Sequence, residues 1–136
     1  MITLTNLTNY KINEDFLKKA AVASDLESKN KILKEISLVF VTENKIKEIN
    51  RQYRRKNEAT DILSFAGLNE IFICPDFVQK QAKILKTPFA GELMRVLIHG
   101  ILHLKGFDHE KSRIAAEKMR KKEEEILRKI NGRAKK

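Results

Sequence analysis

All three histidines of the chain lie within eleven residues, from His99 to His109. His99 and His103 are four residues apart, so on a helix their imidazole rings lie on one face, about one turn apart. Gly106 is suited to end that helix, because a left-handed residue at a helix C-terminus gives glycine no Cβ clash, and the chain can then bring His109 back to the same point. Three neutral imidazoles with a fourth position open are the ligands of a catalytic zinc site. The spacing therefore predicts one Zn²⁺ ion held by His99, His103 and His109, although nickel, copper and iron suit the same ligands.

Gly100 separates two chemistries that this spacing allows. One class of helical zinc protease has the same H-x3-H-x2-G-x2-H spacing, but a glutamate directly follows its first histidine and moves a proton from the metal-bound water to the leaving amine. Glycine cannot do this, and its simpler role is to let the helix approach a neighbour closely. A phosphodiester depends less on such a base, because a metal ion and an arginine can stabilise the charge of its transition state.

Arg54 is our candidate for that second positive charge, because it precedes a predicted strand that would line the same cleft. A solvated surface arginine is the simpler alternative. Asp108 has two roles open to it: it can orient a metal ligand from behind, or act as a base. Four other residues are expected to be structural, at the start of the metal helix, at strand ends or in the core: Glu92, Asp61, Ser64 and Cys74.

Apolar patterns predict four strands, at residues 2–8, 36–41, 60–65 and 70–74, with the last two forming a hairpin. Helices are predicted to begin near Asn13, Thr42, Pro75 and Thr87, and a final helix at residues 111–130. The second helix carries Ile46, Ile49 and Tyr53 on one side. This order of elements predicts an α+β fold, a small mixed four-stranded sheet packed with about five helices, one of them a zincin-like metal helix.

The composition predicts one domain at residues 1–130 and a basic flexible tail at residues 131–136. Hydrophobic residues make up 42% and charged residues 34%, as in ordinary globular proteins. No apolar run approaches the roughly 20 residues that cross a bilayer, and no secretory signal is visible. A single cysteine excludes an internal disulfide. We therefore expect a cytoplasmic protein with no membrane association.

The net charge of +10 points to an anionic partner. Residues 111–136 hold eleven Lys or Arg against four Asp or Glu. A second basic group is formed by Arg51, Arg54, Arg55 and Lys56. A solubilising surface is the simpler explanation of the C-terminal charge, but beside a predicted metal site the charge favours nucleic acid.

These residues resemble the signature of the YbeY endoribonucleases, which are bacterial ribosomal-RNA maturation factors. The main match is His99-Gly-x-Leu-His103-Leu-x-Gly-Phe-Asp108-His109. Two further matches are Asn50-x-x-Tyr53-Arg54 with Thr60-Asp61-Ile-Leu-Ser64-Phe65, and Ile71-x-Ile73-Cys74. The chain departs from the family pattern at Asn69-Glu70, where Gly-Asp is usual. The connection from Ser64-Phe65 to the Ile71-x-Ile73 strand is also shorter than in the family.

The resemblance implies a single-strand-specific endoribonuclease with Zn²⁺ on the three histidines and Arg54 as a catalytic arginine. It also implies a role in small-subunit ribosomal-RNA processing and ribosome quality control in the bacterial cytoplasm, with the ribosome or small-subunit proteins as partners. Two alternatives stay open: a metal-dependent peptide or amide hydrolase, and a non-catalytic, zinc-stabilised RNA-binding module. Also open are the cleavage site, the base preference, the general base, the oligomeric state, and whether the C-terminal basic helix binds RNA or protein.

Overall fold

A computed structural model describes residues 2–26, 36–107 and 110–134. Its four strands, β1 (Ile2–Asn6), β2 (Ile36–Phe40), β3 (Ile62–Phe65) and β4 (Glu70–Ile73), form one mixed sheet in the order β1-β2-β4-β3. β1 and β2 are parallel, as are β2 and β4. β3 pairs with β4 as the predicted antiparallel hairpin, with Ile62 opposite Ile73. β3 is therefore an edge strand.

The described residues contain five helices, so the predicted α+β class is confirmed together with the order of its elements. These helices are α1 (Glu14–Leu26), α2 (Glu43–Arg54), α3 (Pro75–Leu85), α4 (Phe89–Leu104) and α5 (Arg113–Ala134). None of them, within those ranges, is long and apolar enough to cross a membrane.

The end of α5 differs from the prediction. The helix continues to Ala134, four residues beyond its predicted end at residue 130, and residues 135–136 of the expected tail lie outside the described residues. Asn131 and Gly132 lie within the helix, since a single glycine weakens a helix by only about 1 kcal/mol. A long helix rich in Lys, Arg and Glu can therefore continue through it.

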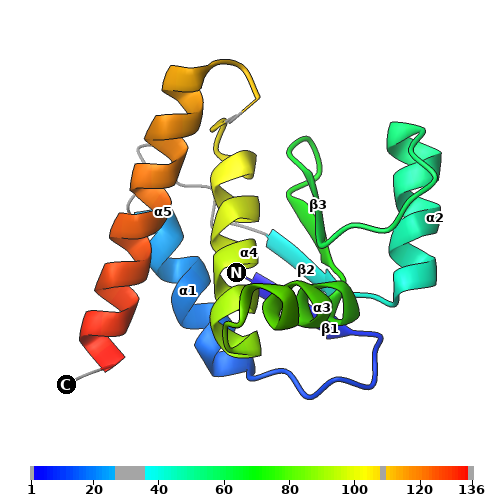
Figure 1. Ribbon diagram of the computed structural model, residues 1–136, viewed down its shortest axis with the longest axis horizontal. Helices are drawn as coiled ribbons and strands as arrows, with labels where there is room; N and C mark the ends of the chain where they lie inside the picture. The colour runs from blue at the N-terminus through cyan, green and yellow to red at the C-terminus, as the bar shows by residue number, and fades with distance from the viewer. Residues whose placement is uncertain (1, 27–35, 108–109, 135–136) are drawn as a thin grey trace.

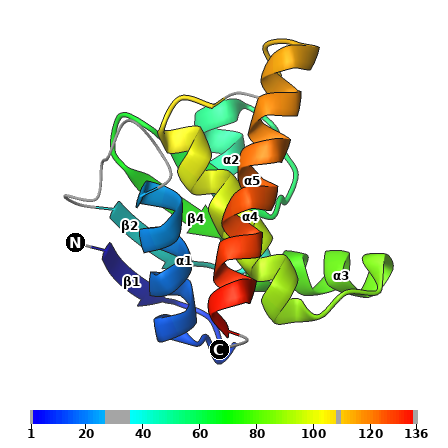
Figure 2. The same ribbon diagram turned by 90° about the vertical axis from the view of Figure 1, so that its left-hand side faces the viewer.

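Helices cover both faces of the sheet (Figure 1). On one face, Leu38, Phe40 and Ile71 pack into a core shared with α1, α4 and α5, and Figure 2 shows α5 in front of α4, with α1 beside them. On the other face, Leu63 packs with Ile46 and Ile49 of α2.

Tyr53 does not share the burial of the two isoleucines with which the sequence groups it. Ile46 and Ile49 are buried, whereas Tyr53 is 65% exposed. Cys74 is fully buried beneath α2, as predicted, and this burial raises the pKa of its thiol.

The residues that were expected to start α2 and to end α4 do so in the structure. The Thr42 hydroxyl accepts a hydrogen bond from the Lys45 N–H at 3.3 Å, which caps α2. At the end of α4, Gly106 has a φ of 95° and the Phe107 N–H donates to the Leu102 carbonyl at 3.1 Å. This reversal is the left-handed helix stop expected of Gly106.

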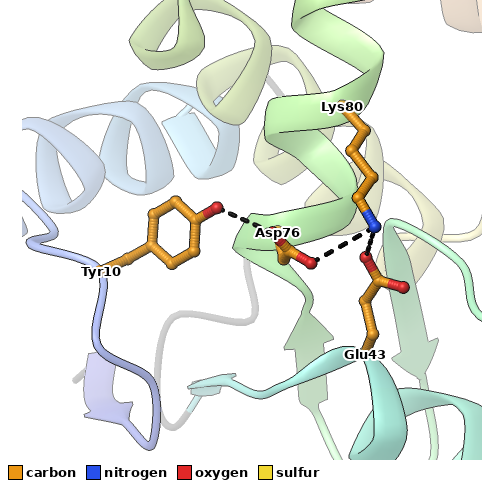
Figure 3. A network of polar contacts seen from close by, with 4 residues as sticks. All are labelled: Tyr10, Glu43, Asp76 and Lys80. Carbon is orange, nitrogen blue, oxygen red and sulfur yellow. Dashed lines mark hydrogen bonds and ion pairs between the residues drawn. The ribbon is translucent and has the colours of Figure 1, made fainter.

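A polar network fixes α3, which forms one side of the cleft described below. The Tyr10 hydroxyl donates to Asp76 at 3.0 Å, and Lys80 pairs with both Asp76 and Glu43 (Figure 3). Hydrogen bonds with Glu43 and Tyr10, and the Lys80 charge, lower the pKa of Asp76. The network thereby ties α3 to the start of α2 and to the segment after β1.

Gly100 is where α4 lies closest to the edge strand. A Cβ at this position would collide with Cδ1 of Ile62 and would lie 3.1 Å from Oγ of Ser64. The Ser64 hydroxyl donates to the Gly100 carbonyl at 3.3 Å, so a hydrogen bond also joins the two elements. The packing role expected for Gly100 is confirmed.

Gly100→Ala should therefore lower the free energy of unfolding by about 1–3 kcal/mol, because the added methyl group must push β3 away from α4. Urea unfolding followed by circular dichroism measures this change.

Gly91→Ala is the matched control, because Gly91 lies in the first turn of the same helix with nothing within 4 Å of its Cβ position. That substitution should be neutral or stabilise the protein by up to about 1 kcal/mol. Equal effects at the two positions would show that contact with β3 does not restrict residue 100.

Candidate active site

A cleft of about 880 Å³ lies between α4 and the edge strand β3. Residues 60–65 form one wall, and His99 and His103 of α4 form part of the other. Arg54, at the end of α2, lines the same cleft. Three residues singled out from the sequence are therefore brought together, although 45 positions separate Arg54 from His99.

The two histidines are arranged as a pair on one face of α4, as their spacing predicts. Their ring centroids are 5.3 Å apart and their planes are inclined by 64°. Two imidazoles bound tetrahedrally to one ion, at zinc–nitrogen distances of about 2.0–2.1 Å, have ring centroids about 5 Å apart. The pair therefore fits two ligands of a single metal ion.

The third predicted ligand, His109, lies outside the described residues, as does Asp108. Within the ranges 2–26, 36–107 and 110–134, no group of three His, Cys, Asp or Glu side chains has an arrangement that could hold a metal ion. Glu110, the residue after His109, lines the cleft.

Glu123 of α5 holds the ring of His99. Its Oε1 lies 2.6 Å from Nδ1 of His99, and both side chains are largely sheltered, with 21% and 32% of their surfaces exposed. An ionised carboxylate can only accept, so the proton of a neutral His99 ring resides on Nδ1, which donates to Glu123. The lone pair is then on Nε2, the nitrogen left for a ligand.

Glu123 belongs to none of the motifs identified above, although the sequence contains a signal for it. Met119, Glu123 and Ile126 follow each other at intervals of four and three residues, and the two apolar members are buried. A carboxylate on the buried stripe of an amphipathic helix needs a polar partner. The pattern marks Glu123 as unusual, but it cannot say that the partner comes from α4.

Arg54 is positioned by the way α2 ends. The helix stops at Arg55, which has a left-handed φ of 58°. The buried Asn50 side chain then donates through Nδ2 to the Glu58 carbonyl at 2.9 Å, which ties the following loop to the helix. This loop leads directly into β3, so Arg54 stays beside the wall of the cleft.

The cleft also contains polar residues for which we expected structural roles. Glu92 is in the first turn of α4, as predicted, but it is only 4% exposed, pairs with Arg95 at 3.4 Å and lines the cleft. Asp61 and Ser64 also line it. Carboxylates and arginines therefore share this space.

Comparisons with known proteins point to one family over nearly the whole chain. The family model described as Endoribonuclease YbeY matches residues 3–131. The Endoribonuclease YbeY of Thermodesulfovibrio yellowstonii is 47% identical over 114 residues, which cover 76% of this chain and 72% of that protein. The one from Aliarcobacter butzleri is 39% identical over 139 residues, covering 96% and 92%.

A solved structure also resembles this fold. The solution structure of TM1509 from Thermotoga maritima superposes with a TM-score of 0.72 at 30% identity, and the match covers 99% of this chain and 92% of that one. The arrangement of the sheet and its helices is thus shared with an experimentally determined protein.

Glu123→Ala should change the tautomer of His99, because the acceptor that favours the proton on Nδ1 is removed. We expect the ¹⁵N shifts of the labelled ring, recorded at pH 8, to move from those of an Nδ1–H imidazole towards a mixture of both tautomers.

Glu124→Ala is the control, because Glu124 is an exposed neighbour that pairs with Arg120 at 2.6 Å. It should leave the His99 shifts unchanged. Identical His99 spectra in wild type and Glu123→Ala would contradict the assigned hydrogen bond.

Proposed function

Because the chain belongs to the YbeY endoribonuclease family, we propose that it cleaves RNA in the cleft lined by His99, His103 and Arg54. The observation that carries this proposal is the meeting of a ligand-like histidine pair with an arginine from a distant helix. A metal-binding group beside a fixed positive charge is what a phosphodiester requires for hydrolysis.

His99, His103 and His109 would hold one metal ion, Zn²⁺ by preference for three neutral imidazoles. The 5.3 Å separation of the first two rings supports this, and so does the position of Glu110 in the cleft, directly after His109. Such an ion, when bound, supplies a Lewis acid and lowers the pKa of a coordinated water molecule.

Side chains of the protein would stabilise charge, orient His99 and move a proton. The Arg54 guanidinium would hydrogen-bond the non-bridging oxygens of the scissile phosphate and stabilise their growing negative charge. Glu123 would keep His99 in the tautomer that presents Nε2. Asp108 is proposed either to orient a histidine or to accept a proton.

The natural RNA, in this proposal, is single-stranded ribosomal RNA of the small subunit, and the setting is ribosome maturation in the cytoplasm. The family signature supports this choice. The net charge of +10 favours any RNA, because cations near the surface attract phosphate. Contacts with the ribosome or with small-subunit proteins belong to the same proposal.

Gly100 counts against the alternative peptide or amide hydrolase. The glutamate of the helical zinc proteases would occupy this position, where even a Cβ meets Ile62 and Ser64. With α4 this close to β3, a carboxylate side chain has no room at residue 100.

His103→Ala should abolish both metal binding and RNA cleavage. Metal analysis of the purified wild-type protein should find about one ion per chain, in keeping with the three-ligand site. Cleavage assays would use a single-stranded RNA, with casein as the alternative substrate.

Undiminished RNA cleavage by His103→Ala would overturn the metal-dependent mechanism. Casein hydrolysis without RNA cleavage would favour the amide hydrolase. Metal and RNA binding by the wild type without turnover would favour the non-catalytic RNA-binding module.

Arg54→Ala should lower kcat by about 10²–10³-fold, the usual effect of removing a group that stabilises transition-state charge, and should weaken RNA binding much less. Lys47→Ala is the control, because Lys47 is an exposed cation of the same helix that does not line the cleft. Equal losses of kcat and affinity in Arg54→Ala would make this arginine a docking residue.

A further inference from the structure

Tyr53 leaves a large aromatic ring in solvent at the end of α2. Its 65% exposure contrasts with the burial of Ile46 and Ile49, which anchor the same helix. A tyrosine so exposed contributes little to the core, and most of its ring surface is open to a partner.

The exposed ring is nevertheless supported. Its centroid lies 5.5 Å from that of Phe65, with the ring planes inclined by 67°. Phe65 in turn contacts Phe72 at 5.9 Å and 80°. These two phenylalanines are half-buried on the sheet, so a row of three aromatic rings leads from the sheet surface out to Tyr53. An edge contact of this kind limits the motion of a ring without covering it.

The row lies at the border of the cleft. Phe65 lines the cleft, and so does Arg54, which directly follows Tyr53 in the chain. The loop that joins the two elements is tied down by the hydrogen bond from Asn50 to the Glu58 carbonyl. The ring of Tyr53 is therefore held next to the place where the phosphate of a substrate would meet Arg54.

The charge around Tyr53 indicates what the ring can bind. Arg51, Arg54, Arg55 and Lys56 surround it in sequence, and all four are exposed. Aromatic rings among cations are the usual platform for single-stranded nucleic acid, in which cations hold the backbone and the ring stacks with a base. A partner protein would need acidic side chains opposite these four cations, whereas an RNA strand supplies a negative charge at every nucleotide.

We propose that Tyr53, supported by Phe65, is a stacking site for one unpaired nucleobase of the RNA, next to the nucleotide whose phosphate meets Arg54. This inference rests on the proposed function and extends it to the residue that holds the strand. It also gives a physical reason for single-strand preference, because a paired base within a duplex has no free face to offer the ring.

The test uses the full-length protein and a non-cleavable 2′-O-methyl oligonucleotide that carries 2-aminopurine at each position in turn. Stacking on Tyr53 should quench the fluorescence at one position. Tyr53→Ala should abolish that quenching and weaken binding by about 5- to 150-fold, the effect of losing one stacked base. Tyr53→Phe should preserve both properties.

Two controls separate stacking from a general loss of affinity. Leu68→Ala removes another large exposed side chain, 69% exposed in the β3–β4 turn, and should leave binding unchanged. An oligonucleotide that is abasic at the quenched position should bind wild type and Tyr53→Ala equally. Equal weakening of the intact and abasic oligonucleotides by Tyr53→Ala would overturn the proposal.

These experiments distinguish an error in the stacking site from an error in the proposed RNA cleavage. If the wild type cleaves RNA but Tyr53→Ala binds and quenches normally, only the stacking site is wrong. If RNA is not cleaved at all, position-specific quenching that depends on Tyr53 would still support base binding. A dimer in sedimentation that Tyr53→Ala dissociates, with unchanged RNA affinity, would overturn the proposal in favour of self-association.

Discussion

The contact between Gly100 and the edge strand sets the shape of the cleft. Because residue 100 has no side chain, α4 can lie against Ile62 and Ser64, and the Ser64 hydroxyl fixes that distance through the Gly100 carbonyl. His99, the preceding residue, then lines the cleft whose other wall is the same strand. Gly100, which leaves no room for a protease-type base, is thus also the residue that lets α4 lie against β3, the opposite wall of the cleft.

Three separate parts of the chain supply the candidate site, and each contributes a different physical property. The helix α4 provides the histidine pair, α5 provides the carboxylate that orients one of its rings, and the end of α2 provides cations and an exposed aromatic ring. The cleft also contains Asp61 and Glu92, although the chain as a whole is strongly basic. A pocket with negative groups inside a positive surface suits a bound cation at its centre and a polyanion across its rim.

Local patterns predicted most of this architecture because they act within a few residues. The alternating strand at residues 36–41, the Thr42 cap and the His-x3-His spacing each depend on neighbours in the chain. The partner of Glu123 and the exposure of Tyr53 depend on how the helices and strands pack together. The apolar period of a single helix carries no information about that packing. Tyr53 follows the apolar period of α2, yet it is not buried with Ile46 and Ile49. The end of α5 differs because the apolar period ends at Ile130, whereas the helix continues for four more residues without one.

The position of Glu123 has a consequence for how the protein matures as it is made. Synthesis proceeds from the N-terminus, so His99 and His103 emerge before α5 has been completed. Until α5 docks, the ring of His99 lacks the carboxylate that selects its tautomer. In a newly made chain, the docking of α5 onto α4 is therefore the assembly step that fixes the tautomer of His99.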